Sequence, residues 1–244
     1  MLYYAKTEAL RMLRNRRYII FVVAFPVLLY VINANIYGKQ TDPGGVRYSV
    51  ILMVSMAAYG ALASSMMSTA VPWATERQSG WLRQLQITPL PSWAIIATKL
   101  GAAMLLVLPS LVLVSVVAVV QQGVSLPLGT WAPLLLTMWL GVLPFVALGL
   151  AIGSVFSADA AQPASMICMF ALAIAGGLWF PPEVFGDTMR TIADVTPSFH
   201  YARLGQSLVA GHGLPLTDVL VVAGWGVVLG SAAVFLYRRA TVRA

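Results

Sequence analysis

The sequence predicts an all-α membrane protein with six transmembrane helices, and two observations support this. Hydrophobic residues make up 59% of the 244 positions and charged residues only 9%, whereas a soluble domain carries roughly 25% charged residues. The charges also gather in short stretches and leave long uncharged intervals between them. Lipid is therefore the expected solvent for most of the chain, which is long enough for six helices of roughly 20 residues.

The uncharged intervals locate the spans, because a charge at the bilayer centre is costly. The interval 100–158 is too long for one helix, and residues 121–133, which contain glutamine, glycine and proline, are expected to form a short hairpin loop inside it. Apolar runs of this length favour helices over a β-barrel. The expected spans, within a single domain over 1–244, are 18–37, 49–71, 94–119, 133–155, 162–180 and 218–237.

The basic residues indicate the orientation of these spans. An even number of spans puts both termini on one side, and eleven of the fifteen Lys and Arg residues lie on that side. Cytoplasmic loops carry such an excess, so both termini are expected in the cytoplasm. The net charge of +7 then reflects basic loops that face anionic lipid headgroups, and no nucleic-acid partner is expected.

Two cytoplasmic segments outside the spans have helical patterns. Residues 2–17 place apolar side chains on one side and basic ones on the other, which predicts an amphipathic interfacial helix; the alternative is a basic flank that only sets the orientation. Residues 74–92 predict a short helix that ends at Pro89 and Pro91. Glu76 suits the first turn of that helix and favours a protein partner over a simple connector at the membrane surface.

The outer segment 181–213 is longer than a connection between spans requires, and it predicts a pair of amphipathic helices. The first would begin at Pro181 and Pro182 and end at Pro197, with Glu183, Asp187, Arg190 and Asp194 in one stripe. The second would cover about 198–210, including Tyr201. This pair either dips into the outer leaflet and caps the bundle, or forms a solvated lid with no role in transport.

The sequence lacks the residues for several kinds of chemistry. The two histidines, His200 and His212, lie in the outer segment and are interpreted as loop residues, so no catalytic or metal site is expected. The single Cys168 is interpreted as a small buried hydrophobe. No Gly-rich phosphate loop with a Lys-Ser/Thr pair occurs. If ATP drives this protein, the ATPase is therefore another chain.

Three stretches of the chain resemble the ABC-2 type transporter permeases. The string "ERQSGWLRQLQITPLPSWAIIATKLGAAML" is similar to their signature, as "ALGLAIGSVFSADAAQ" and "GGLWFPPEVFGDTMRTIADVTPSFHYARLGQSLV" are to their later segments, the last through Pro197 and Tyr201. Gln78 departs from the pattern, because many relatives carry an acidic residue there. The residues that match the signature are Glu76, Arg77, Gly80, Leu82, Leu85, Thr88, Pro89, Leu90, Lys99 and Leu100.

The resemblance implies the transmembrane subunit of an ATP-binding cassette exporter in a bacterial cytoplasmic membrane. It implies that segment 74–92 is the coupling helix, which docks a separate ATP-binding subunit that holds the ATP and Mg. It also implies pairing with a second copy or with a sister permease. It further implies that this chain itself binds no cofactor and has no enzymatic activity. The residues expected to couple to the ATPase are Glu76, Arg77, Gly80, Trp81, Leu82, Leu85, Thr88 and Pro89.

The expected cargo is a small amphipathic or hydrophobic compound, such as a drug, an antibiotic or a lipid-like molecule, because the outer connections are short overall and no large extracellular domain is expected. The alternatives are export of a polysaccharide or lipid-linked glycan, and a membrane sensor or scaffold that docks an ATPase without transport. Methionine suits adaptable apolar surfaces, although packing between helices explains such residues equally well. The cargo contacts expected on spans two and five are Tyr59, Met66, Met67, Met166, Met169 and Phe170.

Overall fold

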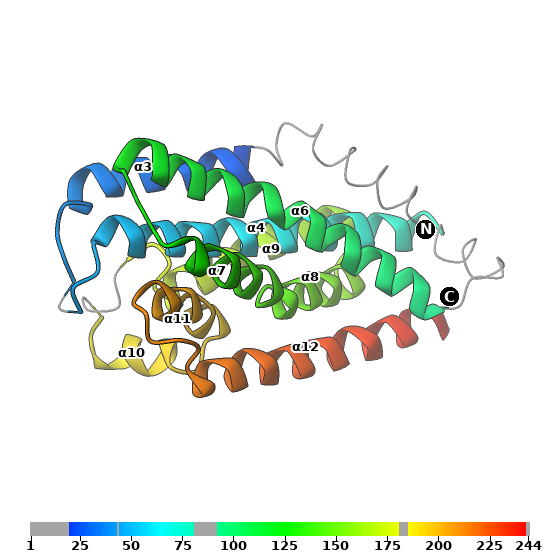
Figure 1. The fold of residues 1–244 in the computed structure, drawn as a ribbon. Coiled ribbons are helices and arrows are strands. Elements are labelled where there is room, and N and C mark those ends of the chain that lie inside the picture. The colour runs from blue at the N-terminus through cyan, green and yellow to red at the C-terminus, as the bar shows by residue number, and fades with distance from the viewer. Residues whose placement is uncertain (1–19, 43, 81–91, 181–184, 243–244) are drawn as a thin grey trace.

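The computed structural model describes residues 20–42, 44–80, 92–180 and 185–242, which form an elongated bundle of helices (Figure 1). Within these ranges the only β contact is an isolated antiparallel bridge between Thr41 and Arg47. The all-α prediction is therefore confirmed for the described residues. The expected interfacial helix 2–17 lies outside them.

Five helical stretches of the described chain are long and apolar enough to cross a membrane. They correspond to the second to sixth expected spans. The first expected span is represented by η1 (Ile20–Ala24) and α3 (Phe25–Tyr37), a shorter apolar helix, so the count of six stays a prediction. The five stretches are α4 (Tyr48–Gln78), Ala97–Gln122 of α6 (Ser92–Gln122), α7 (Leu128–Leu140) with α8 (Leu143–Val155), α9 (Ala158–Ala175) and Leu216–Tyr237 of α12 (Leu216–Val242).

The centre of the bundle is α4. In its most apolar 18-residue window 89% of the residues are buried, against 22% in α9 and 11% in α12. It packs against α3, α6, α8, α9 and the outer helix α11 (Pro197–Val209). The other long helices therefore keep apolar faces for lipid or for a partner, whereas α4 has nearly all of its surface inside the protein.

Small residues allow the neighbouring helices to approach α4 closely. A Cβ atom added at Gly149 of α8 would lie 2.0 Å from Thr69 Oγ1, and one added at Gly153 would lie 2.4 Å from the carbonyl oxygen of Ala70. Gly149 and Gly153 form a G-x-x-x-G pattern, which allows the backbones of two membrane helices to come into contact. These two glycines thus fix the contact between α4 and α8.

The fourth expected span, 133–155, is broken into α7 and α8 at residues 141–142. Pro144 stands at the start of α8, where its missing N–H is tolerated, and the Tyr201 hydroxyl of α11 donates a 2.6 Å hydrogen bond to the carbonyl of Met138 just before the break. A Cβ atom at Gly141 would lie 2.8 Å from the Tyr201 ring. The break therefore lets the outer helix α11 bind the backbone of the span.

Several expected boundaries are wrong. The hairpin loop covers only 123–127, since Gly129 and Pro133 lie inside α7; a proline interrupts one backbone hydrogen bond, and neighbouring helices can compensate for that loss within a membrane. The helix α9 begins at Ala158 and not at 162, because the Ser157 hydroxyl accepts a hydrogen bond from the Ala160 N–H and caps it.

The first outer helix is also shorter than expected. The helix α10 covers Asp187–Ala193, and Gly186 precedes it in an extended conformation, so this helix does not begin at Pro181 and Pro182. Asp187 stands in its first turn, where a negative charge is favourable. Glu183, the first member of the expected acidic stripe, lies outside the described residues.

We expect Gly153→Val to destabilise the protein, because the added side chain would overlap the backbone of α4. Overpacking of this kind costs about 1–3 kcal/mol, measurable as a lower midpoint of thermal unfolding of the purified protein in detergent. Gly224→Val is the matched control, since a Cβ atom at Gly224 of α12 has no neighbour within 4 Å. Equal midpoints for the two variants would contradict the assigned contact between α4 and α8.

Candidate functional site

The last turn of α4 contacts two other parts of the chain. Glu76 forms an ion pair with Lys99 of α6, and both side chains are largely buried. The Arg77 guanidinium donates a 2.6 Å hydrogen bond to the carbonyl of Phe156. The Gln78 side-chain oxygen accepts a 3.1 Å bond from the N–H of Ala158. The end of α4 is thereby tied to α6 and to the turn between α8 and α9.

These contacts correct the expected position of Glu76. Span two was expected to end at 71, with Glu76 opening a new helix over 74–92. Instead α4 continues through Pro72 and ends at Gln78. Gly80, which follows it, has a φ of +74°, the left-handed conformation typical of the residue after a helix end. The other expected coupling residues, Trp81, Leu82, Leu85, Thr88 and Pro89, lie outside the described residues. Their docking role stays a prediction.

The three contacts lie at the last residues of α4, directly before the segment 79–91 in the sequence. In the sequence, residues 79–91 connect α4 to α6. The Glu76–Lys99 pair joins those two helices directly. Arg77 and Gln78 join the same end to the turn after α8. A force applied to residues 79–91 would therefore reach α4, α6, α8 and α9 together.

We expect Lys99→Met to destabilise the protein, because it removes the ion pair between two largely buried side chains, Glu76 of α4 and Lys99 of α6. Removing one partner of such a pair costs about 3–5 kcal/mol, measurable by thermal or denaturant unfolding. The double variant Glu76→Gln/Lys99→Met removes both charges and should recover most of that loss. If the double variant is no more stable than Lys99→Met, the pair does not carry the stability assigned to it.

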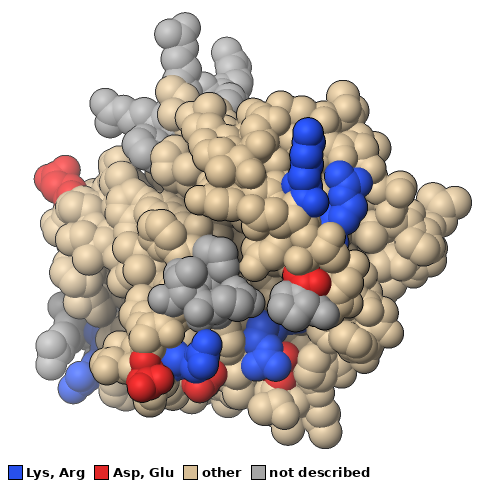
Figure 2. Space-filling view, turned by 90° about the vertical axis from the view of Figure 1, so that its left-hand side faces the viewer, with Lys and Arg blue, Asp and Glu red and all other residues tan. Residues whose placement is uncertain are grey.

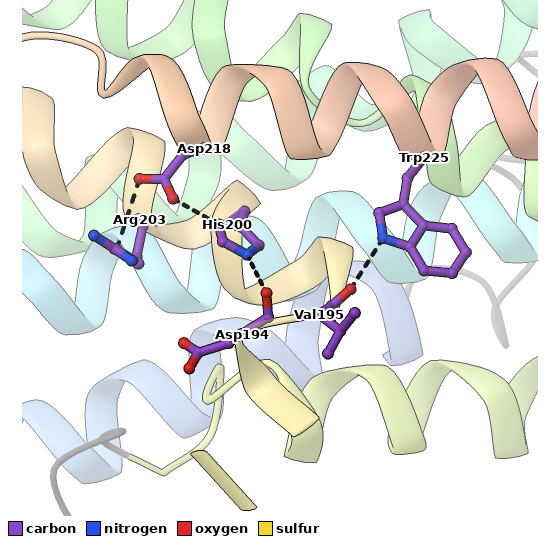
Figure 3. A network of polar contacts seen from close by, with 6 residues as sticks. All are labelled: Asp194, Val195, His200, Arg203, Asp218 and Trp225. Carbon is purple, nitrogen blue, oxygen red and sulfur yellow. Dashed lines mark hydrogen bonds and ion pairs between the residues drawn. The ribbon is translucent and has the colours of Figure 1, made fainter. Parts of the chain in front are cut away.

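The opposite end of the bundle contains a network of polar contacts that joins α10, α11 and α12 (Figure 3). His200 Nδ1 lies 2.6 Å from Asp218 Oδ1, and His200 Nε2 lies 2.8 Å from the carbonyl oxygen of Asp194. Arg203 Nε lies 3.6 Å from the other oxygen of Asp218. The Trp225 indole N–H donates a 3.0 Å hydrogen bond to the carbonyl of Val195. Basic and acidic side chains are interspersed on this end (Figure 2).

Both His200 and Asp218 are buried, with side chains 6% and 1% exposed. The interpretation of His200 as a loop residue is therefore wrong, because it lies inside α11 and its ring has two polar partners. The available signal was the position of Asp218 in the first turn of the last span, where a carboxylate needs a partner. The sequence did not indicate that the partner would come from α11.

A pocket of about 380 Å³ opens beside this network, a volume that suits a small molecule. It lies between the connection after α3, the beginning of α4, the residues after α9, and α11. Burial raises the pKa of Tyr201 well above its usual range, so this hydroxyl remains a donor to Met138 and keeps α11 in place. The charged and polar side chains in the lining include Asp42, Ser55, Arg203, Gln206 and His212.

The expected cargo residues Tyr59 and Phe170 meet in one aromatic cluster with Phe25 and Trp179, and Trp179 also lines the pocket. The Tyr59 and Trp179 rings are 5.2 Å apart. Among the described residues, neither the Tyr59 hydroxyl nor the Trp179 indole N–H has a hydrogen-bond partner. Met66 and Met169 are buried inside the bundle, whereas Met67 and Met166 are half-buried.

The fold and its two polar ends define a class, the multi-pass helical membrane proteins. The family model described as "ABC-2 family transporter protein" matches residues 32–237, and the chain belongs to this family. It is also 25% identical over 218 residues to a protein of Bacillus subtilis (strain 168) named "Putative transport permease YvfS". That similarity covers 89% of each of the two chains. The expected resemblance to ABC-2 permeases is thus confirmed.

Proposed function

We propose that this chain is the transmembrane subunit of an ATP-driven exporter. It would lie in a bacterial cytoplasmic membrane with both termini inside, and it would pair with a second copy or a sister permease. A separate subunit would bind ATP and Mg and carry out the hydrolysis, with no enzymatic activity in this chain. The observation that carries the proposal is the set of contacts at the end of α4, in a chain that belongs to the ABC-2 family.

The contacts at the end of α4 support a mechanism in which docking moves the spans. An ATPase that binds residues 79–91 pulls on α4 and, through Lys99, on α6. The bonds from Arg77 and Gln78 pass the same displacement to the turn before α9. Four helices then shift as one unit, which is the rigid-body kind of transition that alternates access across a membrane.

We expect Leu82→Arg and Leu85→Arg to abolish co-purification of the permease with its ATPase subunit while the spans still insert. The physical reason is that a charge in place of a leucine expected to be buried against the ATPase would lack a partner there. Leu214→Arg makes the same change at an exposed residue of the opposite end and should retain the ATPase. Retention of the ATPase and of full transport by both docking variants would exclude the coupling role of this segment.

We further propose that the cargo is a small amphipathic compound that contacts the aromatic cluster and leaves through the outer pocket. The four aromatic rings suit an apolar body, and the Tyr59 hydroxyl and the Trp179 N–H are two buried donors that remain available to a hydrogen-bond acceptor. This combination favours a neutral or weakly polar molecule that carries carbonyl or ether oxygens.

We expect Tyr59→Phe and Trp179→Phe to raise the KM for such a cargo, because each variant removes a donor and keeps an aromatic ring. The measurement is ATP hydrolysis by the reconstituted complex, stimulated by Nile red, a neutral aromatic dye with oxygen acceptors. Trp131→Phe is the matched control, since Trp131 of α7 lies outside both the pocket and the cluster. If the chain docks the ATPase but no cargo stimulates ATP hydrolysis, the chain is instead a membrane sensor or scaffold.

A further inference from the structure

The His200 ring is held between two groups that can only accept hydrogen bonds when Asp218 is ionised (Figure 3). Its Nε2 faces a backbone carbonyl at 2.8 Å, so this nitrogen must carry a proton. Its Nδ1 faces a carboxylate oxygen at 2.6 Å. A neutral imidazole has one N–H, so its second nitrogen would then direct a lone pair at the negatively charged oxygen.

The geometry therefore requires one more proton than a neutral histidine and an ionised aspartate hold together. We propose that His200 and Asp218 form a proton-binding site, and that the bound proton holds α11 against α12 and against the end of α10. The inference goes beyond the proposed export function, because it concerns what the outer end of the bundle binds. The ligand is the proton itself, taken from the aqueous phase on that side.

The surrounding charges place this proton on the ring. Arg203 Nε lies 3.6 Å from Asp218 Oδ2, too far for a hydrogen bond but close enough to favour the ionised carboxylate. Asp194 contacts the ring through its backbone carbonyl, and the charged residues of α10, Asp187 and Arg190, are exposed. The other helices packed against α11 add no charge here. The helix α7 contains no charged residue, and Glu76, Arg77 and Asp159 lie where the end of α4 meets the start of α9, far along α4 from the part that contacts α11.

The bound proton affects the outer pocket through α11. One face of α11 carries His200, and the same helix supplies Arg203 and Gln206 to the pocket lining. Loss of the proton would leave a lone pair and a carboxylate 2.6 Å apart inside a buried site, and their repulsion would separate α11 from α12. The α11 wall of the pocket would then move with the pH of the adjacent solution.

The chain offers a direct spectroscopic test, because it contains only two histidines. Protein labelled with 15N-histidine in lipid nanodiscs gives the ring-nitrogen signals of His200 and His212 alone, and the variant His212→Asn assigns them. His212 is exposed after α11 and acts as the internal reference. We expect the His200 signals to show two protonated ring nitrogens at neutral pH, because both nitrogens face acceptor oxygens.

One result of this measurement would exclude the proton site. If the His200 signals show only one protonated ring nitrogen at neutral pH, the proposed proton site does not exist. This measurement uses the unmodified chain, with the variant needed only for assignment, so it does not depend on the stability of any substitution in the network.

A pair of variants tests the role of the carboxylate. Asp218→Asn should leave His200 with one protonated ring nitrogen at neutral pH and should speed amide hydrogen exchange in 197–209 roughly tenfold, because a hydrogen bond to a charged group contributes at least that factor. Asp187→Asn removes an equal charge from exposed α10 and should change neither readout. If Asp218→Asn leaves the His200 signals and the exchange unchanged, the assignment is overturned.

Discussion

The enclosure of α4 is the constraint on which the rest of the structure depends. Membrane helices do not associate through the hydrophobic effect, because lipid is as apolar as their side chains, so close packing and interhelical hydrogen bonds hold them together. Small residues on both sides of the contact allow this, as Gly149 and Gly153 of α8 do against Thr69 and Ala70. Since α4 has neighbours on nearly every face, its position determines where the surrounding helices lie.

Interhelical hydrogen bonds fix how three of the neighbours are aligned along α4. The Ser64 hydroxyl donates to the carbonyl of Leu106 at 2.7 Å, which aligns α6. The Trp73 indole donates to Ser154 Oγ at 2.9 Å, which aligns α8. Gln206 of α11 donates to Ser55 Oγ at 3.1 Å. Polar groups in hydrocarbon need internal partners, so a helix that slid along α4 would lose packing and hydrogen bonds together.

The two ends of α4 lead to two different polar systems. At one end Glu76, Arg77 and Gln78 bind α6 and the turn after α8, which suits a surface that receives a mechanical input. At the other end the beginning of α4 forms part of the pocket that α11 closes. A single buried helix thus joins the proposed docking end to the proposed exit end. In the proposed mechanism, a displacement at the docking end would reach the exit end through this helix.

Hydrophobicity and charge spacing in the sequence determined the all-α class, the approximate positions of five long helices and the family signature around Glu76. These features are local, because a helix in lipid satisfies its own backbone and needs only enough apolar residues. The break at 141–142, the continuation through Pro72 and the pairs Arg77–Phe156 and His200–Asp218 were decided by the tertiary structure. Such contacts depend on the rotation and height of each helix against its neighbours, which packing across the whole bundle sets and no local pattern encodes.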